Sequence, residues 1–298
     1  MTAAINPRID VSFKKIFGVD ENKDILISLI NSVVMEKDQV SKVTLLNPYT
    51  PKNFRKDKQS ILDIKAEGQT GTRYNIEIQL ADEKDYDKRA LFYWGKLYTE
   101  QLQQGDDYSV LNKSIGIHIL NFTSIPGEEK YHNIFQLREI DSHLHYFENM
   151  ELHTIELNKF WAAAQEKKEV SEFDFLLSKA KKSLDAWVAF LTRHDLLIQD
   201  NLPSPLGDPA LKKALHVLEN MHFTKQEREW YDDHLKWLRM ETSALKKKAE
   251  DSFQEGIEKG KMDIAKALLE EGVDITTIAK VSGLSLQDLQ ELQKGNKL

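Results

Sequence analysis

Two short segments in which apolar and polar residues alternate constrain the fold of this chain most strongly. Within residues 61–67 and 74–80, apolar side chains fall on one face: Leu62, Ile64 and Ala66, then Tyr74, Ile76, Ile78 and Leu80. Alternation with a period of two is typical of strands that place one face on a core. The intervening Gly68-Gln69-Thr70-Gly71 is typical of a turn, so the pattern predicts an antiparallel hairpin.

The segment before the hairpin predicts a helical region followed by one more strand. Apolar residues recur at helical spacing through residues 10–36, with a break at Gly18. Residues 40–46 form a β-type run that ends at Asn47-Pro48, where the proline disfavours continuation.

The segment after the hairpin completes the pattern. Residues 85–104 predict a helix that ends before Gly105, with Leu91, Trp94, Tyr98 and Leu102 at helical spacing. Residues 115–122 are apolar almost throughout, as expected for a strand covered on both faces. The order α-β-β-β-α-β indicates one α/β domain with a mixed sheet flanked by helices.

Beyond this core the sequence becomes helical. Residues 131–140 and 151–157 predict two further strands that extend or edge the sheet. Helices are expected at 171–195, 209–222 and 225–270, and residues 273–292 resemble a helix-turn-helix unit. We therefore expect an α/β domain over residues 1–160 and an all-α C-terminal extension over residues 161–298.

Composition narrows the class of protein. The chain has 298 residues, no cysteine and a net charge of −7, from 41 basic and 48 acidic residues. The lack of cysteine excludes disulfide frameworks, zinc ribbons and thiol nucleophiles, so any metal ligands are oxygen or nitrogen atoms. No signal peptide, membrane span or phosphate-binding glycine loop is recognisable, which predicts a cytoplasmic protein without membrane contact or nucleotide cofactor.

The polar face of the predicted hairpin carries a candidate metal site. Asp63 and Lys65 on the first strand share a face, as do Glu77 and Gln79 on the second. Two carboxylates that converge from adjacent strands suit Mg²⁺, or Mn²⁺, and an ion so placed activates water for attack on a phosphate. The alternative is an ordinary solvent-exposed polar face of a sheet.

A wider set of motifs resembles the PD-(D/E)XK nuclease family transposases, which are also described as recombination-promoting nucleases. These motifs are Asp10-Val-Ser-Phe-Lys-Lys-Ile-Phe-Gly18, Leu62-Asp-Ile-Lys-Ala66, Asn75-Ile-Glu-Ile-Gln79 and Arg89-Ala-Leu-Phe-Tyr-Trp-Gly-Lys-Leu-Tyr98. The resemblance covers about residues 5–125. It implies a restriction-endonuclease-like core, DNA as the partner, and magnesium-dependent hydrolysis of phosphodiester bonds.

The resemblance also implies roles for individual residues. Asp63 and Glu77 match the metal-binding acids, and Asp10 matches an N-terminal acid that joins the active site; its alternative role is an ion pair with Lys14. Gln79 lies where the broad motif has lysine. Either Gln79 suffices to orient water, or Lys65 supplies the missing charge, or the activity is weak.

Two basic segments are candidates for contact with nucleic acid. Arg89, Tyr93 and Lys96 share one face of the predicted helix, where they reach the phosphate or, for Arg89, satisfy a carboxylate of the core. Lys52, Arg55 and Lys56 lie in a basic loop that meets phosphate or is merely solvated.

The C-terminal unit leaves two interpretations open. The second helix of residues 273–292 carries Asp288 and Glu291, which suits packing or dimerisation as well as DNA recognition.

Taken together, the motifs predict a homodimeric, Mg²⁺-dependent DNA endonuclease, since cutting both strands usually takes two active sites. The alternative is a weak or inactive relative that binds DNA or protein through its helical tail.

Overall fold

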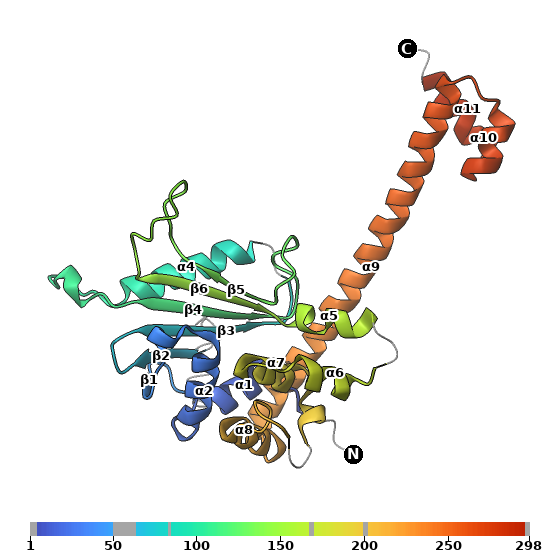
Figure 1. Ribbon diagram of the computed structural model, residues 1–298. Helices are drawn as coiled ribbons and strands as arrows, with labels where there is room; N and C mark the ends of the chain where they lie inside the picture. Colours follow the sequence, from blue (N-terminus) through green and yellow to red (C-terminus); the bar gives the residue numbers. More distant parts are fainter. Residues whose placement is uncertain (1–4, 50–63, 83–84, 167–169, 199–201, 296–298) are drawn as a thin grey trace. The chain divides into compact units, whose positions relative to one another are not determined.

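A six-stranded mixed sheet forms the centre of the protein. The computed structural model describes residues 5–49, 64–82, 85–166, 170–198 and 202–295. The strands lie in the order β1-β2-β3-β4-β6-β5 (Figure 1). Their bounds are β1 Val43–Leu45, β2 Ile64–Gly68, β3 Arg73–Gln79, β4 Ser114–Leu120, β5 His132–Phe135 and β6 Met150–Glu156.

Strand pairing confirms the predicted antiparallel hairpin and gives its register. β2 and β3 are antiparallel, and Ile64 lies opposite Ile76. β3, β4 and β6 are parallel to one another, whereas the edge strands β1 and β5 pair antiparallel with β2 and β6. The three parallel strands therefore end at the same edge of the sheet, which is where open α/β sheets bind their ligands.

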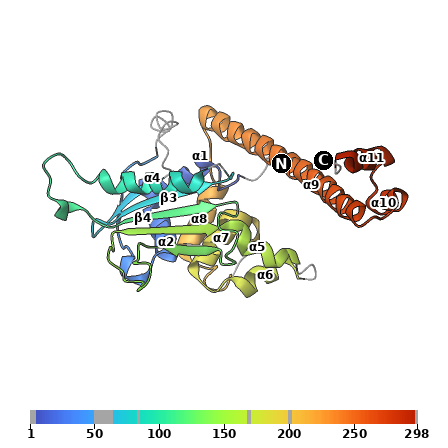
Figure 2. The same ribbon diagram turned by 90° about the horizontal axis from the view of Figure 1, so that it is seen from above.

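Helices cover both faces of the sheet. In chain order they are α1 Asp10–Phe17, α2 Lys23–Val33, α4 Tyr86–Thr99, α5 Leu157–Glu166, α6 Glu172–Lys179, α7 Ser183–Arg193, α8 Pro209–Glu219, α9 Lys225–Glu270, α10 Ile275–Ser282 and α11 Leu286–Gly295. Figures 1 and 2 show α4 on one face, with α1, α2, α7 and α8 on the other. No helix in the described ranges combines the length and the apolarity that a membrane span requires.

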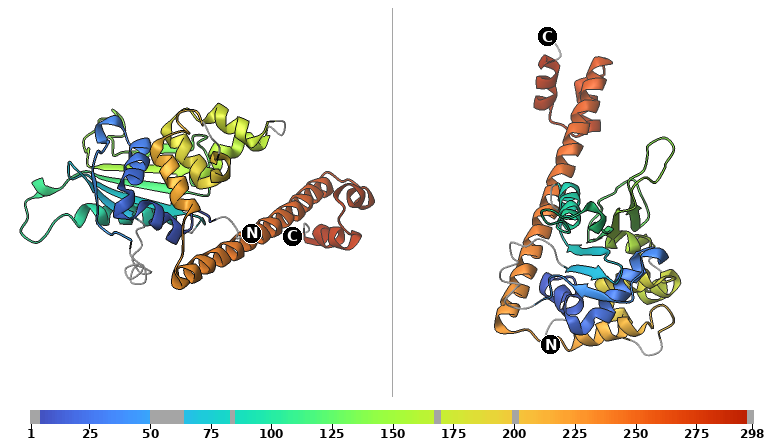
Figure 3. Two further views of the ribbon diagram at one scale, coloured as in Figure 1. Left: turned by 90° about the horizontal axis from the view of Figure 1, so that it is seen from below. Right: turned by 90° about the vertical axis from the view of Figure 1, so that its left-hand side faces the viewer.

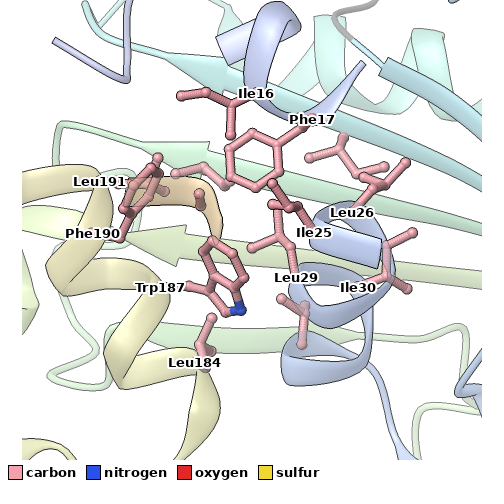
Figure 4. Packing of buried hydrophobic residues seen from close by; sticks show 14 of the residues in the cluster. Ile16, Phe17, Ile25, Leu26, Leu29, Ile30, Leu184, Trp187, Phe190 and Leu191 are labelled. Carbon is pink, nitrogen blue, oxygen red and sulfur yellow. The ribbon is translucent and has the colours of Figure 1, made fainter. Parts of the chain in front are cut away.

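Aromatic residues join helices from distant parts of the sequence beneath the sheet. Phe17 of α1 packs edge-on against Trp187 and Phe190 of α7, with ring centroids 5.6 Å and 6.3 Å away (Figure 4). Trp187 Nε1 also donates to Ser28 Oγ of α2 at 3.3 Å. Figure 3 shows these early and late helices side by side. The helices after residue 160 thus complete the core that the first strands and helices begin.

The chain forms two compact units, Met1–Lys236 and Trp237–Leu298, and α9 contributes to both. The boundary therefore lies inside α9, whereas the sequence placed one after residue 160. In the second unit, Ala265, Ile278 and Leu289 are fully buried in a small core of their own. Gly283, with φ of +72°, ends α10 and permits the turn into α11, as the helix-turn-helix pattern at 273–292 predicted.

Helix α4 is shorter and differently rotated than the sequence predicted. It ends at Thr99, and it buries Tyr86, Ala90, Tyr93 and Leu97, whereas Leu91 of the predicted apolar stripe is 54% exposed. Hydrogen bonds explain the rotation of the helix. Tyr86 bonds to His118 and Arg89 bonds to Gln79, and both partners lie in the sheet.

The predicted helix over residues 171–195 is interrupted. The structure divides it into α6 and α7 because the backbone amides of Lys181 and Lys182 leave the helical ladder and donate to Asp185 Oδ2, each at 2.8 Å. Asp185 lies in the first turn of α7, so this break is also the start of the second helix.

Candidate active site

The face of β3 that turns toward α4 carries three polar residues in succession. Asn75, Glu77 and Gln79 alternate with Tyr74, Ile76 and Ile78, which enter the hydrophobic core on the opposite face. The register places Lys65 of β2 opposite Asn75 and His118 of β4 beside Glu77. Asp63 lies outside the described residues, and so do Lys52, Arg55 and Lys56.

Glu77 is a buried carboxylate, only 5% exposed. Asn75 Nδ2 donates a hydrogen bond of 3.0 Å to Glu77 Oε1. Burial raises the pKa of Glu77 to about 7, although the hydrogen bond from Asn75 and the positive charges of Arg89 and Lys14 act in the opposite direction. No lysine, arginine or histidine in the described ranges forms an ion pair with this carboxylate. A cation bound beside Glu77 would therefore stabilise its ionised carboxylate.

Gln79 is held in place at both ends of its amide. Arg89 Nη2 donates to Gln79 Oε1 at 2.8 Å, and Gln79 Nε2 donates to the carbonyl oxygen of Ala81 at 3.2 Å. The Arg89 guanidinium also lies 5.1 Å from the centre of the Tyr86 ring. The position that the sequence resemblance matches to the motif lysine thus carries a neutral amide hydrogen-bonded to an arginine.

Lys65 and Lys14 are the two candidates for supplying the charge of the motif lysine, and their surroundings differ. Lys65 Nζ, the candidate from the sequence, lies 2.7 Å from Glu100 Oε2. Lys14 of α1 has a side chain that is 10% exposed, lies 3.2 Å from Asp10 Oδ1, and places its charge near enough to act on the pKa of Glu77. The structure therefore links Asp10, Lys14 and Glu77 electrostatically.

The electrostatic link between Lys14 and Glu77 was not predicted from the sequence, where Lys14 was considered only as a helical partner of Asp10. The sequence did contain a sign that Lys14 is buried, because its neighbours Phe13, Ile16 and Phe17 are apolar. All three are fully buried in the structure, and Lys14 is buried with them. A buried lysine needs a specific partner to stay charged.

His118 is a second residue that pattern reading missed. It is fully buried in β4, and its Nδ1 is hydrogen-bonded to Tyr86 Oη at 2.6 Å. Burial, followed by the charges of Arg89 and His153, lowers the pKa of His118 to about 4, so the imidazole is neutral at pH 7. The sequence did contain a sign of this, namely a histidine inside an otherwise apolar strand. A buried polar side chain usually has a hydrogen-bond partner.

The predicted nucleic-acid contacts on α4 occupy different environments. Arg89 points into the site, and Tyr93 is buried, 6% exposed. Lys96 has a side chain that is 54% exposed, with its Nζ 3.6 Å from Glu100 Oε1. Arg89 and Lys96 are thus positioned for different roles, one inside the site and one on the surface of the helix.

The chemistry of the donor atoms fits a hard divalent cation. Glu77 supplies a carboxylate without an ion pair in the described part of the chain, and Asn75 Oδ1 is a buried oxygen without a hydrogen-bond donor there. The described residues contain no cluster of three or more His, Asp or Glu side chains able to hold a metal. Mg²⁺ needs only one or two carboxylates and completes its shell with water and substrate oxygens.

Comparison with known families agrees with this geometry. A model described as PD-(D/E)XK nuclease family transposase matches residues 7–248, and a model described as Rpn/YhgA-like nuclease family, C-terminal HTH domain, matches residues 258–294. No curated protein and no solved structure matches the chain. The first match spans most of the sequence, so the chain belongs to the PD-(D/E)XK nuclease family transposases, and its sheet and flanking helices are the restriction-endonuclease-like core of that family.

The raised pKa of Glu77 predicts a pH-dependent stability in metal-free buffer. Between pH 4.5, the ordinary value, and about 7, the folded state keeps a proton that the unfolded state releases. The free energy of unfolding should therefore fall with rising pH relative to a Glu77→Gln variant, by on the order of 3 kcal/mol across this window. Urea denaturation at pH 4, 5.5, 7 and 8 measures the difference.

The matched control is Asp107→Asn, because hydrogen bonds from Ser109 lower the pKa of Asp107 below its ordinary value of 3.8. The contribution of Asp107 is therefore nearly complete by pH 4, and the stability difference between the parent and Asp107→Asn should stay almost constant from pH 4 to pH 8. A difference between parent and Glu77→Gln that stays constant from pH 4 to pH 8 would contradict the burial argument.

Proposed function

We propose that this protein is a divalent-metal-dependent DNA endonuclease of the transposase-like, recombination-promoting type. The observation that carries the proposal is Glu77, a buried carboxylate without an ion pair in the described ranges, which the sequence motif matches to a metal-binding acid. Membership of a nuclease family supports phosphodiester hydrolysis as the reaction, and the C-terminal HTH match supports DNA as the substrate.

The residues divide the work as follows. Glu77 and Asp63 would hold Mg²⁺ or Mn²⁺, which when bound polarises the phosphate and lowers the pKa of a coordinated water. Asn75 fixes the rotamer of Glu77 through its 3.0 Å hydrogen bond. Arg89 holds Gln79, so the glutamine amide and the guanidinium face the reacting phosphate together. A neutral His118 behind them adds no competing positive charge.

Lys14 supplies the ammonium charge that Gln79 lacks. Both lysines have an acidic partner, Asp10 for Lys14 and Glu100 for Lys65. What distinguishes Lys14 is that its charge acts on the pKa of Glu77. A buried ammonium in a poorly solvated site stabilises developing negative charge more effectively than one at the surface. Cutting both strands takes two such sites, so the proposal includes a homodimer.

The cleavage reaction tests the proposal directly. In a plasmid-nicking assay with Mg²⁺, Glu77→Gln and Asp63→Asn should each lower the rate at least about 100-fold, because each removes a charged ligand without changing side-chain volume. The control is Lys37→Gln, a surface lysine paired with Glu148, which should cut like the parent.

The second function to be distinguished is a non-catalytic relative that binds DNA or protein through its tail. Gln79 favours it, because both ends of its amide are already bonded and no lysine occupies that motif position. Unchanged nicking in the Glu77→Gln and Asp63→Asn variants, or no Mg²⁺-dependent nicking by the parent with binding intact in a gel shift, would favour this second function.

The two lysines give a separate prediction about the missing motif charge. Lys14→Met should reduce kcat by about 10- to 100-fold with little change in KM, and Lys14→Arg should restore part of it, because the charge acts in the transition state. Lys65→Met is the matched variant on β2 and should retain most of the parent's kcat. The reverse order of effects would assign the charge to Lys65 instead.

A further inference from the structure

A pocket opens at the edge of the sheet where the parallel strands end. It has a volume of about 310 Å³, near the lower end of the range for small-molecule sites. Its walls come from the segment before α1, the end of β4, the starts of α5 and α6, and the end of α7. The lining residues that matter here are Arg8, Asn121, Asn158, Trp161, Thr192 and Arg193.

Arg8 brings a positive charge to this pocket without a counter-charge. Its Nη1 donates to Asn121 Oδ1 at 2.7 Å and its Nε to Asn6 Oδ1 at 3.3 Å, and both acceptors are neutral amides. No carboxylate in the described ranges forms an ion pair with Arg8, and burial lowers the pKa of its guanidinium. A partly desolvated guanidinium in this state favours an anion, and phosphate matches its planar donors.

Arg193, the other arginine of the pocket, is already neutralised. It bonds to Glu172, which also lines the pocket, and its Nη2 lies 3.0 Å from Asp195 Oδ2. The positive charge available to a ligand therefore belongs to Arg8, at the end of the pocket formed by Asn121.

The remaining wall suits a planar, hydrogen-bonding group. Trp161 Nε1 donates to Thr192 Oγ1 at 2.8 Å, so what the tryptophan offers a ligand is its ring. Asn158, at the start of α5, donates from Nδ2 to Thr123 Oγ1 at 2.8 Å and accepts at Oδ1 from the Lys159 amide at 3.0 Å, so its amide keeps one N–H and one lone pair for a ligand. A ring on one side and an amide on another are the means by which proteins hold an unstacked base.

The pocket and the candidate active site share one edge of the sheet. The backbone amide of Asn121 donates to the carbonyl oxygen of Gln79 at 2.9 Å, and Arg8 precedes Asp10 by two positions. Neighbouring strands lie about 4.8 Å apart, so the ends of β4 and β6 are about 5 to 10 Å along the edge from the end of β3. A polynucleotide bound at Glu77 and Gln79 would reach the pocket with an adjoining nucleotide.

We infer that this pocket binds one nucleotide of the DNA strand next to the bond that is cut, with its phosphate on Arg8 and its base against Trp161. The inference rests on the proposed function for the identity of the strand, but the pocket's affinity for a phosphorylated nucleotide does not depend on cleavage.

Isothermal titration of the full chain tests the pocket. The probes are a 5′-phosphorylated deoxydinucleotide, the same dinucleotide without the phosphate, and inorganic phosphate, at fixed ionic strength and without divalent metal. The parent should bind the phosphorylated probe at least tenfold more tightly than either of the others. Arg8→Gln should weaken that binding at least tenfold, and Arg8→Lys should retain part of it because it keeps the charge but not the planar donors. Arg138→Gln, a surface arginine of another segment, should leave it unchanged.

Asn158→Asp is the second variant, because it adds a negative charge to the pocket without changing the shape of the side chain. It should weaken the phosphorylated probe more than the unphosphorylated one, which loses the Asn158 donor but brings less negative charge to the new carboxylate. If folded Arg8→Gln and Asn158→Asp proteins bind the phosphorylated probe like the parent, or if inorganic phosphate binds as tightly as the dinucleotide, the nucleotide pocket is overturned.

Cleavage separates this inference from the proposed function. On a short duplex with Mg²⁺, Arg8→Gln should raise KM at least tenfold and change kcat little. A parent that cuts, with an Arg8→Gln variant that binds and cuts equally well, overturns the pocket alone. A parent that does not cut but loses the phosphorylated probe on Arg8→Gln substitution overturns the nuclease proposal and supports the pocket.

Discussion

The structure depends on one constraint, namely that strand β3 is covered on both faces. Its apolar side chains Tyr74 and Ile76 are buried in the main core, and α4 lies over the opposite face. Polar residues on that second face are therefore removed from water, which is costly unless each finds a partner. Both ends of the Gln79 amide find partners within the protein, whereas Glu77 receives one neutral hydrogen bond and Asn75 Oδ1 receives none from the described residues. The carboxylate is thus prepared for a cation.

The coverage of β3 on both faces also explains how the neighbours of Glu77 are placed. Helix α4 is rotated so that Arg89 meets Gln79, which leaves Leu91 exposed. His118 remains neutral because it is buried beside Arg89. The site therefore combines nearby positive charge with a carboxylate that has no ion pair in the described residues, a combination suited to binding a metal ion and a phosphate together.

The strands could be predicted from the sequence because their alternation is a local property. The antiparallel hairpin, the buried β4 and the position of the helix-turn-helix turn at Gly283 all follow from residue patterns. Contacts between distant segments could not be predicted in this way. The packing of Phe17 on Trp187, the rotation of α4 by Arg89, and the approach of Lys14 to Glu77 depend on tertiary structure, which periodicity does not encode.

The central claim, that Glu77 is a metal ligand, is tested most directly by Mn²⁺ binding followed by electron paramagnetic resonance at pH 8, where the Glu77 carboxyl is ionised. The parent should remove free Mn²⁺ from solution at a site for which Mg²⁺ competes. Glu77→Gln should lose that site, and Glu67→Gln, a neighbouring strand carboxylate paired with Arg73, should keep it. Equal Mn²⁺ binding by the parent and the Glu77→Gln variant would contradict the account.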